Sequence, residues 1–163
     1  MICDQRVKAD CKRHSFSPVH SLFTENDNSI ETGRPPLVKV AAHLMKKLIY
    51  ANKDRLSGSV IVAGFDPVDG ASVYNIQQGG SCLKMDFALG GSGSTYIYGL
   101  MDADYRPDLT NAQARDLLKK ALSHAMARDG GSGGIVRTIL VTAEGHERDY
   151  VSGNALPFGP VGY

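Results

Sequence analysis

Apolar residues recur with helical spacing from residue 37 onward, directly after Pro35-Pro36, a dipeptide that suits a first helical turn. The predicted helix is amphipathic, and its polar side carries Lys39, Lys46 and Lys47. Its apolar face consists of Leu37, Val40, Ala41, Leu44 and Leu48.

The spacing then changes to that of strands. Residues 59–65 form an apolar run that predicts a strand buried on both faces, and Asp66-Pro67-Val68-Asp69-Gly70 is typical of a turn. Residues 71–76 return as the second strand of a hairpin. A further strand is predicted over residues 82–86, and the apolar residues 87–89 continue it.

The rest of the chain alternates between helix and hairpin. We expect a helix from Ser94 to Tyr105 and another from Asn111 to Arg128, capped by Thr110, followed by a hairpin over residues 135–143 and 148–152. Short connections make the sheets antiparallel with helices packed over them, so the pattern predicts an α+β fold. The inner face expected for the second helix is Ala114, Leu117, Leu118, Ala121, Leu122 and Ala125.

Residues 1–33 differ from the rest of the chain. They mix charges, histidines and small polar residues with few apolar repeats, which predicts a loop-like N-terminal segment. We therefore divide the chain into this segment and a domain over residues 34–163.

Two glycine-serine clusters lie at boundaries between elements. Gly90-Gly91-Ser92-Gly93-Ser94-Thr95 follows a strand, and Arg128-Asp129-Gly130-Gly131-Ser132-Gly133-Gly134 follows a helix. Glycine permits close backbone approach, and serine and aspartate supply hydroxyl and carboxylate groups. A serine of the first cluster can instead cap a helix, and the second cluster can be a helix C-cap. Together, the clusters favour a shared hydrogen-bonded site.

Other kinds of site fit less well. The first cluster lacks the lysine of a Walker loop and the third glycine of a dinucleotide fingerprint, and it lacks the surroundings of a hydrolase nucleophile elbow. Cys3, Cys11, His14 and His20 match no usual zinc spacing. We therefore expect no metal and no cofactor.

Composition narrows the partners and the compartment. A net charge of +1 gives no case for binding nucleic acid or an anionic membrane, and the chain has no apolar run long enough to span a bilayer. Cys3, Cys11 and Cys82 indicate free thiols in a reducing compartment. We expect a cytoplasmic and nuclear protein whose partners are other proteins.

The two clusters carry a family resemblance. With Tyr96-Ile97-Tyr98-Gly99 after the first and Ile135-Val136-Arg137 after the second, the chain resembles the beta-type subunits of the 20S proteasome core. The resemblance runs from about Arg34 to Pro157 and is closest to the caspase-like class and its immune-inducible relative.

This resemblance implies an alpha-beta-beta-alpha sandwich of the N-terminal-nucleophile-hydrolase type, which assembles with other alpha and beta subunits in stacked rings. Such subunits cleave polypeptides with an N-terminal threonine, released by autolysis of a Gly-Thr bond, whose hydroxyl attacks and whose amine is the base. A lysine and an aspartate of the first strands support that threonine. Ser92, Asp129 and Ser132 match the family's remaining supporting residues.

The head of the chain departs from the family. The sequence contains no Gly-Thr dipeptide, and residues 1–33 show no counterpart of the first strands with their nucleophile. We expect the complete subunit to be a threonine-type endopeptidase, and this chain alone to be an inert, incomplete sandwich with unpaired sheet edges. An alternative first exon, an incomplete gene model and a non-catalytic paralogue with a structural or interaction role all fit this pattern.

Overall fold

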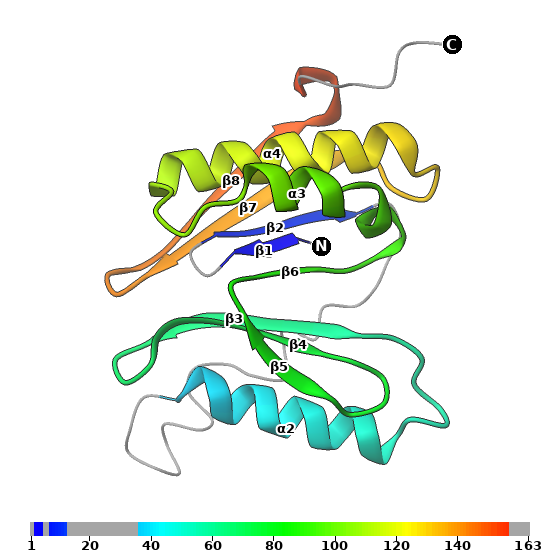
Figure 1. Cartoon of the computed structure of the whole chain (residues 1–163), viewed down its shortest axis with the longest axis vertical. Coiled ribbons are helices and arrows are strands. Elements are labelled where there is room, and N and C mark those ends of the chain that lie inside the picture. The colour runs from blue at the N-terminus through cyan, green and yellow to red at the C-terminus, as the bar shows by residue number, and fades with distance from the viewer. Residues whose placement is uncertain (1, 5–6, 13–35, 157–163) are drawn as a thin grey trace.

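The computed structural model describes residues 2–4, 7–12 and 36–156. These residues form two antiparallel sheets that face each other, with helices on both outer sides (Figure 1). The arrangement is the predicted alpha-beta-beta-alpha sandwich.

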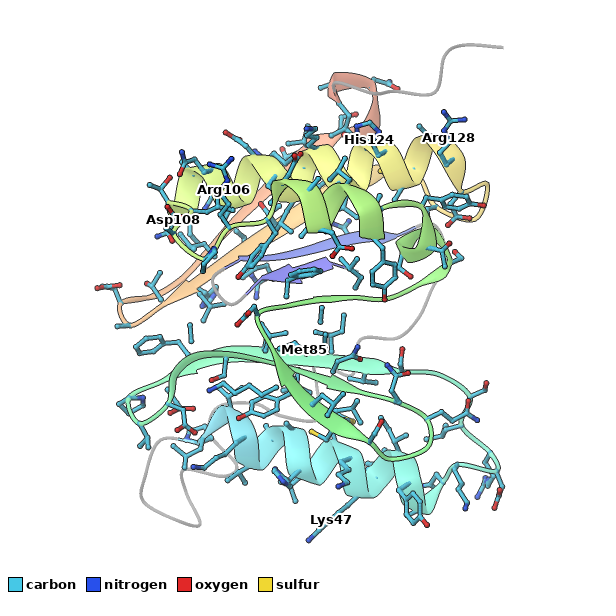
Figure 2. The ribbon with its side chains drawn as sticks, viewed as in Figure 1. Lys47, Met85, Arg106, Asp108, His124 and Arg128 are labelled. Carbon is cyan, nitrogen blue, oxygen red and sulfur yellow. The ribbon has the colours of Figure 1, made fainter. Side chains whose placement is uncertain are left out.

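The smaller sheet carries the helix α2 (Val38–Ala51) on its outer face (Figure 1). Its strands are ordered β3 (Val60–Asp66), β4 (Gly70–Ile76) and β5 (Cys82–Met85), each antiparallel to the next, as the sequence predicts. Side chains fill the space between helix and sheet (Figure 2). The buried residues of this cluster are Val38, Ala42, Met45, Ile49, Tyr74 and Ile76.

The face that α2 turns to the sheet is not the predicted one. Val40, Leu44 and Leu48 are 45%, 40% and 43% exposed, while a second row, from Val38 to Ile49, is buried. Helix α2 is apolar around its circumference except on the flank that carries its lysines, so two rows of apolar residues both have helical spacing. The periodicity of the helix alone therefore could not decide between them.

Burial along β3 also differs from the prediction. The strand is half-buried along most of its length, and Phe65 is 38% exposed. The reason is its position, because β3 is an edge strand of the described three-stranded sheet. Only Asp66, at its end, is fully buried within the strand.

Asp66 fixes the start of α2. Its Oδ2 accepts a hydrogen bond from the Val38 N–H at 3.0 Å, while its Oδ1 accepts from the Val68 N–H at 3.0 Å and the Asp69 N–H at 2.8 Å. The helix has no side-chain cap of its own, since its N-cap residue is Leu37. One carboxylate therefore satisfies a helix terminus and a β-turn together.

The larger sheet has the strand order β6-β1-β2-β7-β8. Its members are β6 (Phe87–Leu89), β1 (Ile2–Asp4), β2 (Val7–Lys12), β7 (Ile135–Thr142) and β8 (Gly145–Ser152), and all neighbours are antiparallel. The hairpin of β1 and β2 thus lies between strands from the second half of the chain. The two sheets meet at a small buried cluster made by Val73 and Ala88, with Ile61 and Ala63 against it.

The strands β1 and β2 correct the expectation of a loop-like segment over residues 1–33. Val7, Ala9 and Cys11 alternate with Lys8, Asp10 and Lys12, which is the period of a half-buried strand. The alternation is short and rich in charge, and the surrounding composition obscured it. Residues 13–33 lie outside the described part of the chain.

The helices over the larger sheet follow the prediction closely, with one break. The expected helix from Ser94 to Tyr105 is a 3-10 turn, η2 (Ser92–Tyr96), followed by α3 (Tyr98–Asp104). The second helix, α4 (Asn111–Arg128), buries its whole predicted inner face.

Helix α4 is also fixed by specific contacts at its N-terminus and with β8. Thr110 forms a reciprocal capping box with Gln113. Lys119 Nζ lies 3.0 Å from Asp149 Oδ2, which ties α4 to β8.

A short 3-10 turn, η3 (Gly153–Ala155), follows β8. None of the helices described here is both long and apolar enough to cross a membrane.

Candidate functional site

The two glycine-serine clusters meet at one end of the larger sheet. The first begins where β6 ends at Leu89, and the second leads from α4 into β7 at Ile135. The register brings the N-terminal hairpin to the same end, because Ile2 of β1 pairs with Leu89 and Lys12 of β2 pairs with Ile135. Because Ser152 of β8 pairs with Ile135, an end of each of the five strands lies at the end of the sheet where the clusters meet.

The carboxylate of Asp129 joins the two clusters. Its Oδ2 accepts hydrogen bonds from Ser92 Oγ at 2.6 Å and from Ser132 Oγ at 2.5 Å, and its Oδ1 accepts from the Gly131 N–H at 3.0 Å. Ser92 and Asp129 are 37 residues apart in the sequence. The structure thus brings together all three residues that the sequence singled out, and their role stays a prediction.

Glycine is required where the loops touch. A Cβ atom on the buried Gly93 would lie 3.2 Å from Ala125 Cβ and 3.2 Å from Asp129 Oδ2, so a side chain there would require these neighbours to shift by a few tenths of an ångström. Gly91 has a φ of 94°, which L-residues with a side chain rarely adopt. These two glycines allow Ser92 to reach the carboxylate.

The same hydrogen bonds determine the charge of the site. The Ser132 hydroxyl, the Ser92 hydroxyl and the Gly131 N–H hold the pKa of Asp129 below its usual range. Asp129 is therefore ionised at neutral pH. Both serines donate their protons to it, so the lone pairs of their oxygens remain available to a third group.

The structure also settles the capping alternatives. Asp129 does occupy the C-cap position of α4, and its N–H donates to the Ala125 carbonyl at 2.8 Å. Its side chain, however, binds the serines and the Gly131 N–H. In the first cluster it is Ser94 that bonds locally, to the Gly91 carbonyl at 2.7 Å. The sequence analysis did not identify the Gly131 N–H as a donor to Asp129, because no residue type indicates that its backbone N–H will form such a bond.

Across residues 36–156, where side chains are described, no group of three or more His, Cys, Asp or Glu side chains could hold an ion. The chemistry of the cluster is that of an anionic hydrogen-bond acceptor with two oriented hydroxyls.

Comparison with known proteins gives the family of this chain. The family model described as "Proteasome subunit" matches residues 24–141. The chain is 42% identical over 131 residues to proteasome subunit beta type-6 of Arabidopsis thaliana, an alignment that covers 80% of this chain and 56% of that protein. It is 48% identical over 122 residues to the Dictyostelium discoideum beta type-6 subunit, covering 75% of this chain and 57% of that protein.

A third relative is proteasome subunit beta type-9 of Homo sapiens, which is 40% identical over 130 residues, with 80% of this chain and 59% of that protein covered. The chain thus spans just over half the length of these relatives. The family match begins at residue 24, within the segment that the sequence set apart, and it includes both clusters of the site. This chain belongs to the proteasome subunit family, and it resembles the beta-type members of that family.

Proposed function

We propose that this chain carries the supporting half of a threonine-peptidase site in a beta-type proteasome subunit. In the complete subunit an N-terminal threonine hydroxyl attacks the peptide bond and its free amine takes the proton. The substrate class is polypeptide, the partners are other alpha and beta subunits, and the compartments are cytoplasm and nucleus. The observation that carries this proposal is the bonding of Asp129 Oδ2 to serines from two distant loops.

The geometry supports a particular role for the three residues. Ser92 and Ser132 give their protons to Asp129, so each hydroxyl oxygen can accept a hydrogen bond from an amine or a hydroxyl. The negative charge behind the serines favours the protonated form of an amine that has taken a proton from the nucleophile. The cluster thereby orients the base and stabilises the charge that it gains.

The position of the cluster supports the same role. Strand β1 begins, at Ile2, next to the end of β6 and hence beside the loop that holds Ser92. A nucleophile carried at the start of a strand in this place would lie beside the cluster. In this proposal the cluster of Ser92, Asp129 and Ser132 orients the amine base and stabilises its charge, and the threonine of the complete subunit attacks the peptide bond.

The test is Asp129→Asn in the complete, assembled subunit, measured on a fluorogenic peptide. We expect kcat to fall by roughly tenfold or more, because replacing a carboxylate that orients a general base usually slows the chemical step by at least that much. KM should change little, because Asp129 acts on proton transfer and does not contact the substrate. Asp108→Asn, in the exposed loop before α4, is the matched control and should leave both constants unchanged. A variant with unaltered kcat would contradict the proposal.

A second function, that of a non-catalytic paralogue, is favoured by one observation: the sequence contains no Gly-Thr dipeptide. A probe that reacts with N-terminal threonine should not label the 163-residue chain under either hypothesis. Native sizing of the endogenous protein from cytosolic and nuclear extracts, followed by intact mass and N-terminal sequencing, separates the two. A large particle with a mature N-terminal threonine supports the peptidase. The same particle with an unprocessed head supports a structural paralogue. A small monomer alone contradicts assembly into the particle and supports a free-standing interaction paralogue.

A further inference from the structure

We propose that Ser94 is a positioning residue for the site, one that holds the Gly91–Ser92 peptide in the orientation from which Ser92 reaches Asp129. Ser94 belongs to the first glycine-serine cluster, but the described donors to the Asp129 carboxylate are Ser92, Ser132 and Gly131. Its hold on Ser92 is a matter of geometry alone, whereas its effect on catalysis rests on the proposed function.

The Gly91 carbonyl accepts two hydrogen bonds from Ser94. The Ser94 hydroxyl donates at 2.7 Å and the Ser94 N–H donates at 3.1 Å. That carbonyl and the Ser92 N–H belong to the same planar peptide unit, so fixing the direction of one fixes the direction of the other. Between this plane and the Ser92 hydroxyl, only the N–Cα and Cα–Cβ bonds of Ser92 can still rotate. Ser94 therefore sets the position from which the Ser92 hydroxyl donates to Asp129 Oδ2 at 2.6 Å.

The peptide before Ser92 has little else to hold it. Gly91 and Ser92 are both exposed, so packing does not fix them, and glycine has the least restricted backbone of any residue. On the other side of Ser92, Gly93 is buried at the end of α4. Thr95 Oγ1 lies 3.5 Å from the Ser92 carbonyl, which is beyond the usual length of a hydroxyl hydrogen bond. Among the hydrogen bonds described for this loop, only those from Ser94 reach the Gly91 carbonyl.

Ser94 is itself fixed to the core of the larger sheet. Its carbonyl accepts a hydrogen bond from the Ile97 N–H at 3.2 Å, and Ile97 is 1% exposed within the core cluster that α4 covers. Ser94 is half-buried, unlike the serine that it holds. A continuous row of bonds therefore runs from the core through Ser94 and Gly91 to Ser92, and from there to Asp129.

A bond from a serine to the carbonyl three residues earlier can also serve only to stabilise a turn. The two roles differ in what they predict for the carboxylate. If Ser94 only stabilises η2, its loss lowers the stability of the chain and leaves Asp129 unchanged. If Ser94 positions Ser92, its loss also weakens the hydrogen bond from Ser92 to Asp129.

The pKa of Asp129 reports that difference. It is held below its usual range by the Ser132 hydroxyl, the Ser92 hydroxyl and the Gly131 N–H, so it rises when the bond from Ser92 weakens. Asp129 forms no ion pair within the part of the chain that the structure describes. A change in its pKa therefore reflects these three donors.

The test is the titration of Asp129 in the full 163-residue chain, followed by carbon-13 NMR of its carboxyl group. Ser92→Ala should raise the pKa and sets the largest effect that loss of this bond can have. Ser94→Ala should raise it in the same direction, but by less. Ser94→Thr keeps the hydroxyl and should restore the wild-type pKa. Ser94→Val has the shape of threonine without the hydroxyl and should not, so this pair isolates the hydroxyl even where Ser94→Ala lowers stability.

The double variant Ser92→Ala/Ser94→Ala decides whether Ser94 acts through Ser92. If it does, replacing Ser94 adds no further shift to the pKa of Asp129 once the Ser92 hydroxyl is gone. A role in stabilising the turn would instead lower the thermal midpoint of both the single and the double variant, without this dependence on Ser92.

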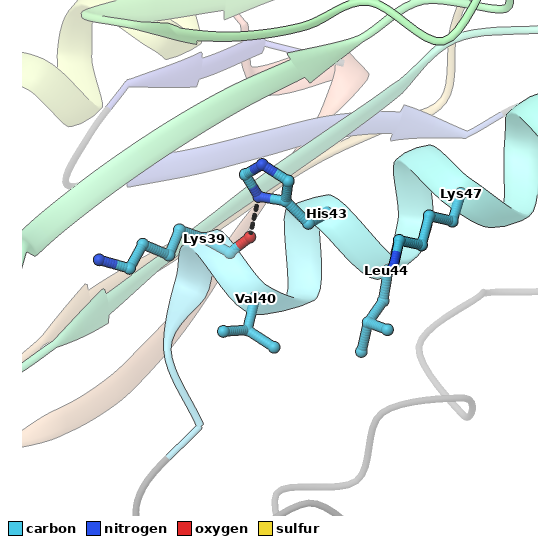
Figure 3. Close-up of a pocket in the computed structure, with 5 residues that line it drawn as sticks. All are labelled: Lys39, Val40, His43, Leu44 and Lys47. Atoms are coloured by element: carbon cyan, nitrogen blue, oxygen red, sulfur yellow. Dashed lines mark hydrogen bonds between the residues drawn. The ribbon is translucent and has the colours of Figure 1, made fainter.

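Two matched controls remove a side-chain bond to a backbone carbonyl elsewhere. Ser123→Ala removes a hydroxyl that donates to the Lys119 carbonyl at 2.8 Å within α4. His43→Ala removes the ring whose Nδ1 lies 2.8 Å from the Lys39 carbonyl, on the helix that covers the smaller sheet (Figure 3). Both variants should leave the pKa of Asp129 unchanged.

The proposed function adds a kinetic expectation for the complete, assembled subunit. Ser94→Ala should lower kcat by roughly two- to tenfold, the effect of one neutral hydrogen bond, and Ser94→Thr should restore it. KM should change little, because Ser94 does not face the substrate. If kcat is unaltered in Asp129→Asn, the proposed function fails, and the titration still decides whether Ser94 positions Ser92.

Three results of the titration would overturn the positioning role. The first is an unchanged pKa of Asp129 in Ser94→Ala. The second is the same pKa in Ser94→Thr and Ser94→Val. The third is a further shift in the double variant as large as that of Ser94→Ala alone, since it would show that Ser94 acts on the carboxylate independently of Ser92.

Discussion

The buried carboxylate of Asp66 should be one of the largest single contributions to the stability of the smaller sheet and its helix. Asp66 is 1% exposed, and it joins the end of β3 to the first turn of α2 through the Val38 N–H. Asp66→Ala removes the acceptor for three backbone donors. Asp66→Asn preserves the shape but replaces one oxygen with an NH₂ group, so it removes the charge and one acceptor.

The expected loss can be worked from the three hydrogen bonds. The Val38 N–H is buried and would be left without a partner, which costs about 1–3 kcal/mol. The N–H groups of Val68 and Asp69 are partly buried and can regain water, so each costs about 0.5–1 kcal/mol. Asp66→Ala should therefore lower the free energy of unfolding by about 3 kcal/mol, and Asp66→Asn by about 2 kcal/mol.

The pH dependence has a definite sign. Burial raises the pKa of Asp66, but the backbone N–H groups of Asp69, Val38 and Val68 outweigh it and hold the pKa below its usual value. A group whose pKa is lower in the folded state stabilises the fold above its unfolded pKa, which is about 3.9 for aspartate. The difference between the wild type and Asp66→Asn should be constant near neutral pH and should shrink as the pH falls below about 4.

The assay is urea unfolding followed by far-ultraviolet circular dichroism, because the sequence contains no tryptophan. Hydrogen exchange should show that protection is lost first in the opening turn of α2. Asp69→Asn is the matched control. It removes only the ion pair with Lys39, in which the Lys39 side chain is 44% exposed and the Asp69 side chain 29% exposed, and it should cost less than about 1 kcal/mol. The reasoning is refuted if Asp66→Ala costs no more than this control, or if Asp66→Asn is as stable as the wild type.

Three further changes test other parts of the fold. Gly93→Ala forces a Cβ to within 3.2 Å of Ala125 Cβ and should destabilise the chain by about 1–3 kcal/mol; an unchanged thermal midpoint would show that the loop yields freely. Thr110→Ala removes the cap of α4 and should cost about 1 kcal/mol in denaturant unfolding, so a loss below a few tenths would contradict the capping argument. Asp149→Asn breaks the pair with Lys119, whose hydrogen bond lowers the pKa of Asp149. The loss should stay below about 1 kcal/mol and shrink as the pH falls below about 4 and through that lowered pKa, and a loss that persists undiminished in acid would assign it to packing instead.

The accuracy of the sequence-based predictions varied between elements for physical reasons. Helix α4 was predicted in full, because its cap at Thr110, its inner face and its polar face all agree. Helix α2 was placed correctly, but its orientation was wrong, because two apolar rows have the same period. What turns the row of Val38 inward is contact with the smaller sheet and with Asp66, and no local pattern contains that information.

The N-terminal strands and the site mark the other limits. Strands β1 and β2 pair with each other, but their outer partners, β6 and β7, lie far along the chain, so their short alternation looked like a polar segment. For the site, glycine and serine at two element boundaries indicated a shared hydrogen-bonded site, and the family resemblance then singled out Ser92, Asp129 and Ser132. The convergence of both serines on one carboxylate oxygen depends on how closely η2 approaches the end of α4, which only the structure gives.

The position of the β1–β2 hairpin has a consequence for how the chain folds during synthesis. Its neighbours on either side, β6 and β7, come much later in the sequence, so the hairpin emerges from the ribosome long before it has anything to pair with. An isolated two-stranded hairpin is marginally stable at best in water. The larger sheet can close only after β7 has been translated, and pairing over such long sequence separations is slow. Until then the growing chain exposes unpaired strand edges, which are surfaces where aggregation can start.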